Sequence, residues 1–361
     1  MFMERIPFFI VDKDLPTVKA KEVDLLRRNS NYVIVDVRSL GEWETDRIPG
    51  AVNIQLLDNS ERAEVGTIYK QIGRREAVAK GWEFVEPKLE SMLAEFSKYQ
   101  DKKLIVYCWR GGLRSKSVVK WLLGLGFDVV QLEKGNKAFR EVVRKKLQSY
   151  ELKPKIIVVY GLGLSGKSEV LRATKLPVID LEDLAQHRSS VYGAIGLKPR
   201  SQKLFEALLL DELDKIGDVQ YILVEGESRR VGDAIIPDFF FRAMSKGIKI
   251  RVDASLDRRS ERFEKDYCFS EESTQQLIKI TKETNSLIRE MGKKKVSELI
   301  ELLESGNIFE GLKILLKDYY DLKYEHYFKD MKFEMIICED DVEIAVEKVE
   351  GFVKKLDDKN N

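Results

Sequence analysis

Cys108 is a candidate nucleophile because of the run of residues in which it lies. The run YCWRGGLRS, residues 107–115, begins at the last residue of the short apolar stretch LIVY, residues 104–107. A strand, a tight Gly-rich turn and a helix start in this order point backbone N–H groups inward, and the helix dipole favours a thiolate there. This loop is predicted to stabilise a persulfide or a perselenide and to hold an oxyanion, although a small buried cysteine is the simpler alternative. The positions assigned to this catalytic loop are Cys108, Arg110, Gly111, Gly112 and Arg114.

A second motif predicts a phosphate-binding loop. The run GLGLSGKS, residues 161–168, fits G-x4-G-K-[ST], follows an apolar strand pattern and opens a helix at residues 169–174. Glycines let backbone N–H groups approach phosphate oxygens, Lys167 supplies a point charge, and Ser168 can hold Mg²⁺. Glu225 ends another predicted strand and is assigned the acidic role that assists the metal. The predicted diphosphate-binding positions are Gly161, Gly163, Ser165, Gly166, Lys167 and Ser168.

Several polar residues after the phosphate-binding loop are candidates for contacts with substrate or RNA. Asp180 is expected at the end of a strand, where it can orient substrate or metal, but it can equally cap the following helix. Each of the others also has a plain structural alternative, either a buried structural histidine or a solvated charged loop. These further candidates are His187, Arg188, Arg229 and Arg230.

The elements that must position both loops read as two α/β domains. Short β-branched runs alternate with amphipathic stretches, which is typical of α/β folds. We place the domain boundary near a charged, Pro-containing segment, so that residues 1–150 form the first domain and residues 151–361 the second, with a C-terminal helical region. The predicted strands are residues 32–37, 51–56, 104–107 and 129–132 in the first domain, and residues 155–160, 177–180, 221–225, 248–253 and 333–338 in the second.

Composition excludes several other classes of protein. The net charge of +1 does not indicate a protein that coats nucleic acid, although a local basic groove remains compatible with it. Three widely spaced cysteines and two histidines give no disulfide framework and no zinc pattern. No apolar run has the length of a membrane span, and the N-terminus lacks a signal-peptide pattern. We therefore expect a cytoplasmic enzyme with no membrane partner.

The first domain resembles the rhodanese family. Residues 36–54 read DVRSLGEWETDRIPGAVNI, which is similar to the rhodanese pattern of DVR, then Glu, then IPGA-N-I. Asp46 and Arg47 stand where that family commonly has Gly-His. The spacing from Cys108 to Arg114 is C-x5-R, one residue longer than in many sulfurtransferases and similar to the phosphatase relatives of the fold. The cysteine loop alone therefore leaves a phosphatase open.

Both domains together resemble the tRNA 2-selenouridine synthase family. The runs that carry this resemblance are CWRGGLRS, ERAEVGTIYK at residues 61–70, DLEDLAQHRSS at residues 180–190, PRSQKLFE at residues 199–206 and VEGESRRVG at residues 224–232. Ser189 departs from the glycine expected after His-Arg, and Leu162 and Leu164 stand where small or polar residues are commoner. These departures concern fine substrate placement.

That resemblance implies a two-step modification of tRNA. Wobble 2-thiouridine is first S-geranylated from geranyl diphosphate, with Lys167 and a metal stabilising the leaving diphosphate. The geranylthio group is then replaced by selenium from selenophosphate. By analogy with sulfur on rhodanese cysteines, Cys108 is expected to carry or guide selenium. The implied partners are a tRNA with wobble 2-thiouridine and a supply of selenophosphate.

Two other functions remain open at this stage. The C-x5-R spacing and the phosphate-binding loop also suit a rhodanese-type sulfurtransferase or phosphatase fused to a P-loop kinase. A protein in which both loops only sense anions is the other alternative. Failure to bind tRNA, with phosphate released from aryl phosphates by Cys108, would favour the first. Retained tRNA binding without any modified nucleoside would favour the second.

Overall fold

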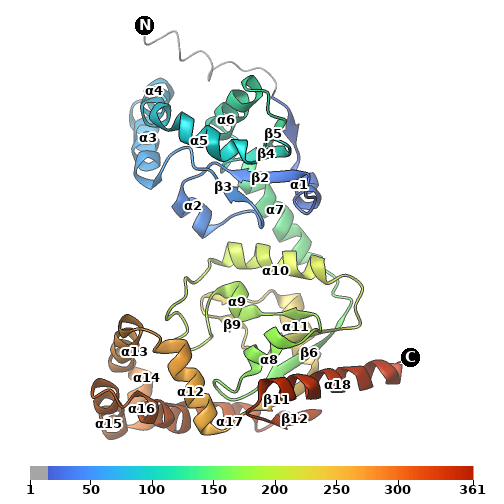
Figure 1. Ribbon diagram of the computed structural model, residues 1–361, viewed down its shortest axis with the longest axis vertical. Helices are drawn as coiled ribbons and strands as arrows, with labels where there is room; N and C mark the ends of the chain where they lie inside the picture. The colour runs from blue at the N-terminus through green and yellow to red at the C-terminus, as the bar shows by residue number, and fades with distance from the viewer. Residues whose placement is uncertain (1–14, 361) are drawn as a thin grey trace. The chain divides into compact units, whose positions relative to one another are not determined.

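The computed structural model describes residues 15–360, and the side chains of residues 15–358. The predicted absence of a signal peptide falls on residues 1–14, which lie outside the described residues. The chain divides into two compact units: residues 1–149 together with Glu206–Leu210 form unit 1, and the remaining residues form unit 2 (Figure 1). Among the described residues, no helix is both long and apolar enough to cross a membrane.

Unit 1 is built on a parallel sheet with the strand order β1-β5-β4-β2-β3. Alternate residues of β2 and β4 face opposite sides, and both sides are buried, as is usual for parallel sheets covered by helices. The elements of this unit are β1 (Thr17–Val18), α1 (Ala20–Leu26), β2 (Tyr32–Asp36), α2 (Leu40–Thr45), β3 (Val52–Asn53), α3 (Asn59–Gln71), α4 (Arg74–Val85), η2 (Glu86–Lys88), α5 (Leu89–Ser97), β4 (Lys103–Tyr107), α6 (Leu113–Gly124), β5 (Val129–Leu132) and α7 (Gly135–Gln148).

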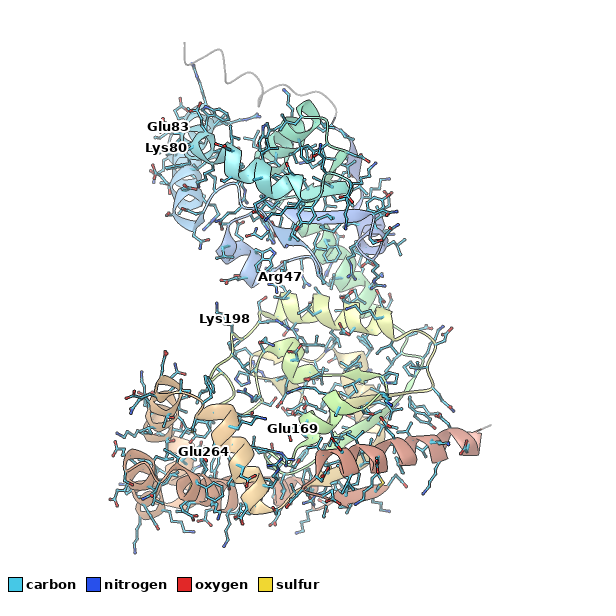
Figure 2. The ribbon with its side chains drawn as sticks, in the orientation of Figure 1. Arg47, Lys80, Glu83, Glu169, Lys198 and Glu264 are labelled. Carbon is cyan, nitrogen blue, oxygen red and sulfur yellow. The ribbon has the colours of Figure 1, made fainter. Side chains whose placement is uncertain are left out.

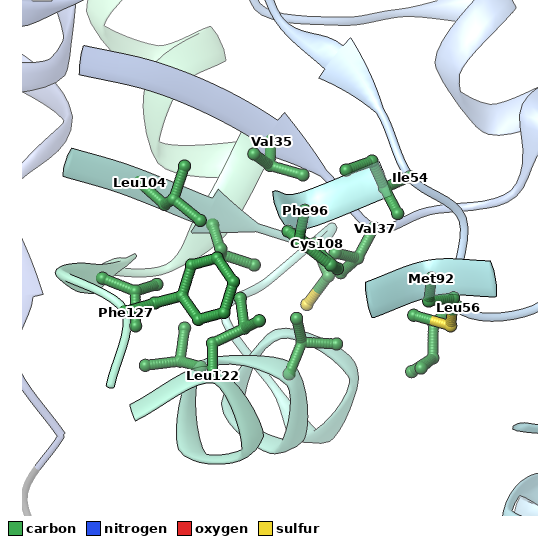
Figure 3. Packing of buried hydrophobic residues seen from close by; sticks show 14 of the residues in the cluster. Val35, Val37, Ile54, Leu56, Met92, Phe96, Leu104, Cys108, Leu122 and Phe127 are labelled. Carbon is green, nitrogen blue, oxygen red and sulfur yellow. The ribbon is translucent and has the colours of Figure 1, made fainter. Parts of the chain in front are cut away.

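One face of this sheet carries Cys108 into the core. Val35, Leu104 and Val106 pack against residues of α5 and α6, and Cys108 continues the same alternation just beyond β4. Figure 3 shows Cys108 among these apolar side chains, with its sulfur directed toward α6. The cysteine is therefore part of the core by position, while the loop that follows it turns outward.

Unit 2 has a second parallel sheet, with the strand order β12-β11-β6-β8-β7. Apolar residues of its central strands pack on α8 and α18, and a separate apolar cluster joins α12 to the helices that follow it. Helix α10 (Gln202–Ile216) belongs to this unit except for Glu206–Leu210, which are part of unit 1. The other elements are β6 (Lys155–Tyr160), α8 (Lys167–Ala173), β7 (Val178–Ile179), α9 (Leu181–Ala185), β8 (Tyr221–Glu225), β9 (Arg230–Val231), β10 (Ala234–Ile235), α11 (Asp238–Lys246), β11 (Ile248–Asp253), α12 (Leu256–Tyr267), α13 (Glu271–Glu283), α14 (Asn285–Met291), α15 (Lys293–Glu304), α16 (Ile308–Leu315), η3 (Leu316–Asp321), α17 (Leu322–Phe328), β12 (Met335–Cys338) and α18 (Val342–Asn360).

The predicted strands all appear in these sheets. Residues 129–132, 155–160, 221–225 and 248–253 have the predicted bounds, whereas the segments predicted at 51–56 and 177–180 shorten to β3 and β7. Both short strands lie at sheet edges, where only one neighbour fixes the ladder. Helix α6 ends at Gly124, and Gly126, with φ of +84°, adopts the left-handed conformation that follows the helix end.

Candidate functional site

The backbone of the cysteine loop is fixed against the start of α7. The N–H groups of Asn136 and Lys137 donate to the carbonyls of Cys108 and Trp109, at 2.9 and 3.0 Å. Gly135 has φ of +58°, and a Cβ atom built there would lie 2.1 Å from the Cys108 carbonyl oxygen. Only glycine permits this approach, so α7 holds the loop in one conformation.

The Cys108 thiol is buried and has a hydroxyl partner. Its Sγ lies 3.1 Å from Ser115 Oγ on α6. Gln131 on β5 donates its amide N–H to the same hydroxyl oxygen at 2.7 Å, and another to the Gly111 carbonyl at 3.0 Å. Because that oxygen already accepts a hydrogen bond, the Ser115 hydroxyl can direct its own hydrogen to the sulfur or to the Gly112 carbonyl, which lies 3.3 Å away.

The two arginines of the loop differ in their surroundings. Arg114 donates to both carboxylate oxygens of Glu42, at 2.6 and 3.1 Å, and both side chains are mostly buried. Burial opposes this charge on Arg114, but the Glu42 partner holds the pKa of the guanidinium above its usual value. Arg110 is exposed at the surface. Arg114 is thus a positioned cation at the base of the loop, whereas Arg110 is open to a ligand in solvent.

The DVR segment, residues 36–38, supports the cysteine loop through buried hydrogen bonds. Arg38 is almost fully buried and makes a double hydrogen bond with Asp36. Its guanidinium also donates to the Asp46 carbonyl, and the Asp46 carboxylate accepts from Asn136 at 2.8 Å. The departure from Gly-His at position 46 therefore has a structural use, because Asp46 ties this segment to α7.

The phosphate-binding loop lies between β6 and α8, as predicted. Gly166 has φ of +93°, and a Cβ there would lie 2.7 Å from the guanidinium of Arg262. Arg262 on α12 also pairs with Glu169 on α8 at 2.6 Å. Leu164 adopts φ of +61°, a left-handed conformation that glycine would take without strain. The loop is thus fixed from the α12 side as well as by its own glycines.

Three carboxylates meet beside Lys167, and two of them were not among the predicted site residues. Oxygen atoms of Glu182, Glu225 and Glu227 all lie within 4.8 Å of one another. Ser168 donates to one oxygen of Glu225, and the other oxygen is buried without a partner among the described residues. Glu182 and Glu227 lie in runs that carry the family resemblance, but their convergence could not be seen in the sequence.

Burial and crowding shape the charge of this cluster. Burial raises the pKa of Glu182 and of Glu227 to about 7 and that of Glu225 to about 8, and repulsion between the carboxylates adds to this effect. Burial alone would lower the pKa of Lys167, but Glu182 and its neighbours hold it above its usual value. Hard oxygen donors with one oxygen unsatisfied suit Mg²⁺, so Ser168, Glu225 and the other two glutamates fit such an ion.

The phosphate-binding loop opens into a cavity of about 300 Å³. Helix α12 supplies Arg262 and Phe263, and the π-helical turn η3 supplies Leu316 and Tyr320. Such π-helical turns inside longer helices often occur at functional sites. The remaining walls include the basic or aromatic residues Arg172, Arg188, Lys265, Tyr267 and Tyr324, and also the acidic residues Glu169, Glu182 and Asp266. The cavity can therefore accept an anion together with an apolar or flat group.

The other predicted residues differ in whether they lie at this cavity. Arg188 lines the cavity, lies over the Tyr267 ring and donates to the Ile195 carbonyl at 3.0 Å. Asp180 caps α9 through the Asp183 N–H, and pairs with Arg172 at 3.3 Å. His187 packs on Gly193 and Gly232.

The two arginines of the later motif lie outside the residues that line this cavity. Arg229 pairs with Asp238, and Arg230 is exposed on β9. Of the five candidates for substrate or tRNA contact, Arg188 alone is brought to the cavity wall by the described structure. The other four lie on a helix cap, in a packed turn or at the surface, where a contact with RNA is compatible with their positions.

Two family models match the chain, one over each domain. Residues 19–142 match the rhodanese-like domain, and residues 154–355 match the AAA domain of tRNA 2-selenouridine synthase. The chain thus joins a rhodanese-like domain to a P-loop domain of a specific type. It belongs to the tRNA 2-selenouridine synthase family.

Individual relatives agree with this assignment. The tRNA 2-selenouridine synthase of Chromohalobacter salexigens is 35% identical over 69% of this chain and 67% of the relative. That of Nitrosomonas europaea is 34% identical over 65% of this chain and 63% of the relative, so the match spans less than two thirds of that protein. The Shewanella halifaxensis protein is 29% identical over 91% of this chain and 96% of its own length.

Proposed function

We propose that this protein converts wobble 2-thiouridine in tRNA into 2-selenouridine, through an S-geranylated intermediate. The observation that carries the proposal is the presence, in one chain of this family, of a supported cysteine loop and a phosphate-binding loop with a carboxylate cluster. Each loop suits one of the two steps. The protein is proposed to act in the cytoplasm, on tRNA, with selenophosphate supplied by another enzyme.

The first step is assigned to the phosphate-binding loop. The sulfur of 2-thiouridine attacks C1 of geranyl diphosphate, the C–S bond forms, the C–O bond to diphosphate breaks, and the uridine N3 proton is released. Backbone N–H groups of residues 161–168 and the Lys167 ammonium stabilise the charge that develops on diphosphate. When bound, Mg²⁺ would supply further positive charge there, held by Ser168 and Glu225.

The second step is assigned to the cysteine loop. Selenium from selenophosphate replaces the geranylthio group at C2, and water completes the balance, so that geranylthiol and phosphate leave. Cys108 is proposed to guide the selenium donor, and this is supported by the contact of its sulfur with the Ser115 hydroxyl on α6 and by the Gly-rich turn between the two residues. Arg114 holds positive charge beside that turn, and Arg110 is exposed at its edge.

Recognition of tRNA is assigned to polar residues of unit 2. Arg188 at the cavity wall is proposed to contact a phosphate, while Asp180, His187, Arg229 and Arg230 are candidates for further substrate or tRNA contacts. These positions carry both signs of charge, in keeping with a balanced net charge and a local binding surface.

Mass spectrometry of tRNA nucleosides tests both assignments. A tRNA bearing 2-thiouridine is incubated with geranyl diphosphate and then with selenophosphate, using wild type, Cys108→Ala and Lys167→Ala. We expect Lys167→Ala to slow geranylation by about 10²–10³-fold, and Cys108→Ala to geranylate normally but to form no 2-selenouridine. Cys338→Ala and Lys279→Ala, both at exposed positions, are matched controls.

Two outcomes would contradict the proposal. If wild type leaves the nucleoside unchanged with both donors present, the synthase assignment is wrong and the phosphatase or kinase fusion becomes the better explanation. If Cys108→Ala stops geranylation as strongly as selenium entry, the assignment of one step to each loop is wrong.

A further inference from the structure

Unit 1 contains an apolar cavity that the cysteine chemistry by itself does not require. It has a volume of about 140 Å³ and opens at the surface of this unit. Its walls come from the segment after β3, from α3 and α4, and from the first turns of α6. Residues that define it are Leu56, Val65, Ala77, Trp82, Val85 and Leu113. Nearly all of the accessible wall is hydrocarbon, so ordered water has few partners there.

The α3–α4 pair creates this hollow. The two helices pack on each other, and Lys80 on α4 pairs with Glu64 on α3 at 3.4 Å and with Glu83 at 3.2 Å (Figure 2). The residues that α4 turns inward include Ala77 and Gly81, whose small size leaves space against Val65. Apolar wall that faces water is unfavourable, so burying a hydrocarbon group against it gains free energy.

The cavity adjoins the residues that follow the cysteine loop. Leu113 and Arg114 follow the loop directly and line the cavity, and Glu42 fixes the Arg114 guanidinium. Leu56 and Val85 on the inner wall belong to the same apolar cluster as Cys108; Figure 3 labels Leu56 and Cys108 within it. A molecule held at the loop by a polar group can therefore place an adjoining hydrocarbon chain in the cavity.

We propose that this cavity binds the geranyl chain of S-geranyl-2-thiouridine while the C2 carbon of the base faces the cysteine loop. This inference rests on the proposed function. An apolar cavity of about 150 Å³ can take a benzene molecule, so a ten-carbon chain fills this one and extends through its opening. The cavity thus distinguishes geranylated tRNA from unmodified 2-thiouridine and holds the leaving thiol away from the attacking selenium.

A cavity-filling substitution tests the proposal in the full-length protein. Ala77→Leu puts three more carbons into the cavity, and Ala79→Leu, on the exposed face of the same helix, is the matched control. Both are given S-geranylated tRNA and selenophosphate, and 2-selenouridine is measured. Each methylene of the chain that loses its buried position costs about fourfold in binding, so Ala77→Leu is expected to raise KM about tenfold or more. Ala79→Leu is expected to match wild type.

A second substrate separates chain recognition from general damage. With S-methyl-2-thiouridine in the tRNA, wild type and Ala77→Leu should react at equal rates, because a methyl group does not reach the filled space. Geranylation of 2-thiouridine by Ala77→Leu should also be unchanged. If Ala77→Leu slows both S-alkyl substrates equally, or neither, the cavity does not bind the chain.

The cavity and the proposed function fail in different ways. Wild type that leaves S-geranylated tRNA unchanged contradicts the function itself. Wild type that reacts, together with an equally active Ala77→Leu, contradicts the cavity alone. If Ala77→Leu does not fold, Val65→Phe fills the same cavity from α3, with Thr67→Phe at an exposed position of that helix as its control.

Discussion

At the scale of single residues, the ion pair between Arg114 and Glu42 places a cation next to the cysteine loop. Glu42 also receives the Ser39 N–H in the capping box of α2, so one carboxylate connects α2 with α6. The ion pair keeps the positive charge of Arg114 near the Cys108 sulfur. Part of the hydrogen-bonding capacity of the Arg114 guanidinium is already used by Glu42. The proposed anion binding at the loop therefore depends on Glu42, which lies 66 positions before Cys108 in the sequence.

Removing the Glu42 carboxylate should weaken the second step selectively. Glu42→Ala leaves Arg114 free to move and to lose its place beside Cys108. We expect about tenfold slower selenium entry into S-geranylated tRNA and about 1 kcal/mol lower stability. Geranylation should not change. Nucleoside mass spectrometry and urea unfolding measure the two effects, and Glu90→Ala, at an exposed position of α5, is the control. Equal loss of both steps would contradict this role of Glu42.

His187 should make the protein sensitive to acid. Burial lowers the pKa of His187, with Arg188 acting in the same direction and Asp233 opposing it. Because the unfolded pKa is the higher one, the neutral form supports the folded state above about pH 6.5, and this support is lost as pH falls toward the folded pKa. His187→Asn should therefore show a smaller difference in Tm between pH 7.5 and pH 5.5 than wild type. The exposed His326 provides the control, and an unchanged difference in His187→Asn would contradict the prediction.

At the scale of elements, both loops are held by helices that come later in the chain. The start of α7 receives the cysteine loop, and α12 presses Arg262 against the phosphate-binding loop. In each case a glycine with positive φ lies at the closest approach, Gly135 in one and Gly166 in the other. The loops are therefore rigid because of neighbouring elements, which favours pre-organised anion sites.

Gly135→Ala should disrupt the cysteine loop. The new methyl group would overlap the Cys108 carbonyl, and the backbone would be strained at φ of +58°. We expect a loss of more than about 2 kcal/mol in stability and little selenium entry. Gly66→Ala on α3, where a Cβ meets nothing within 4 Å, should instead gain about 0.5–1 kcal/mol. Thermal unfolding compares the two variants, and equal stabilities would contradict the packing argument.

At the scale of the whole molecule, the proposed steps belong to loops in different units of one chain. The cysteine loop lies in unit 1 and the phosphate-binding loop in unit 2. Each loop has its own support and its own cavity. A chain built in this way can lose one step and keep the other.

Mixing two inactive variants tests this independence. Neither Cys108→Ala nor Lys167→Ala should form 2-selenouridine efficiently alone from 2-thiouridine. An equimolar mixture should form it, because tRNA geranylated by the first variant can dissociate and be selenated by the second. Nucleoside mass spectrometry over time gives the rate, which should rise with protein concentration. A mixture as inactive as its parts would show that the intermediate is not exchanged between molecules.

Local patterns in the sequence determined the two chemical loops and most of the elements around them. A buried strand, a Gly-rich turn and a helix start are encoded by consecutive residues, so Cys108, Lys167 and Ser168 could be assigned their positions directly. The parallel α/β class follows from the same alternation of short apolar strands and helices.

The tertiary structure alone decided which distant side chains surround these loops. Glu182 and Glu227 join Glu225 because α9 and the segment after β8 meet beside the phosphate-binding loop, a contact that no periodicity encodes. Glu42 reaches Arg114, and Asp46 reaches Asn136, across gaps of 72 and 90 residues. The apolar cavity likewise arises where α3, α4 and α6 pack with small residues facing inward. Such features depend on the packing of separate segments, whereas local motifs depend on backbone preferences within a few residues.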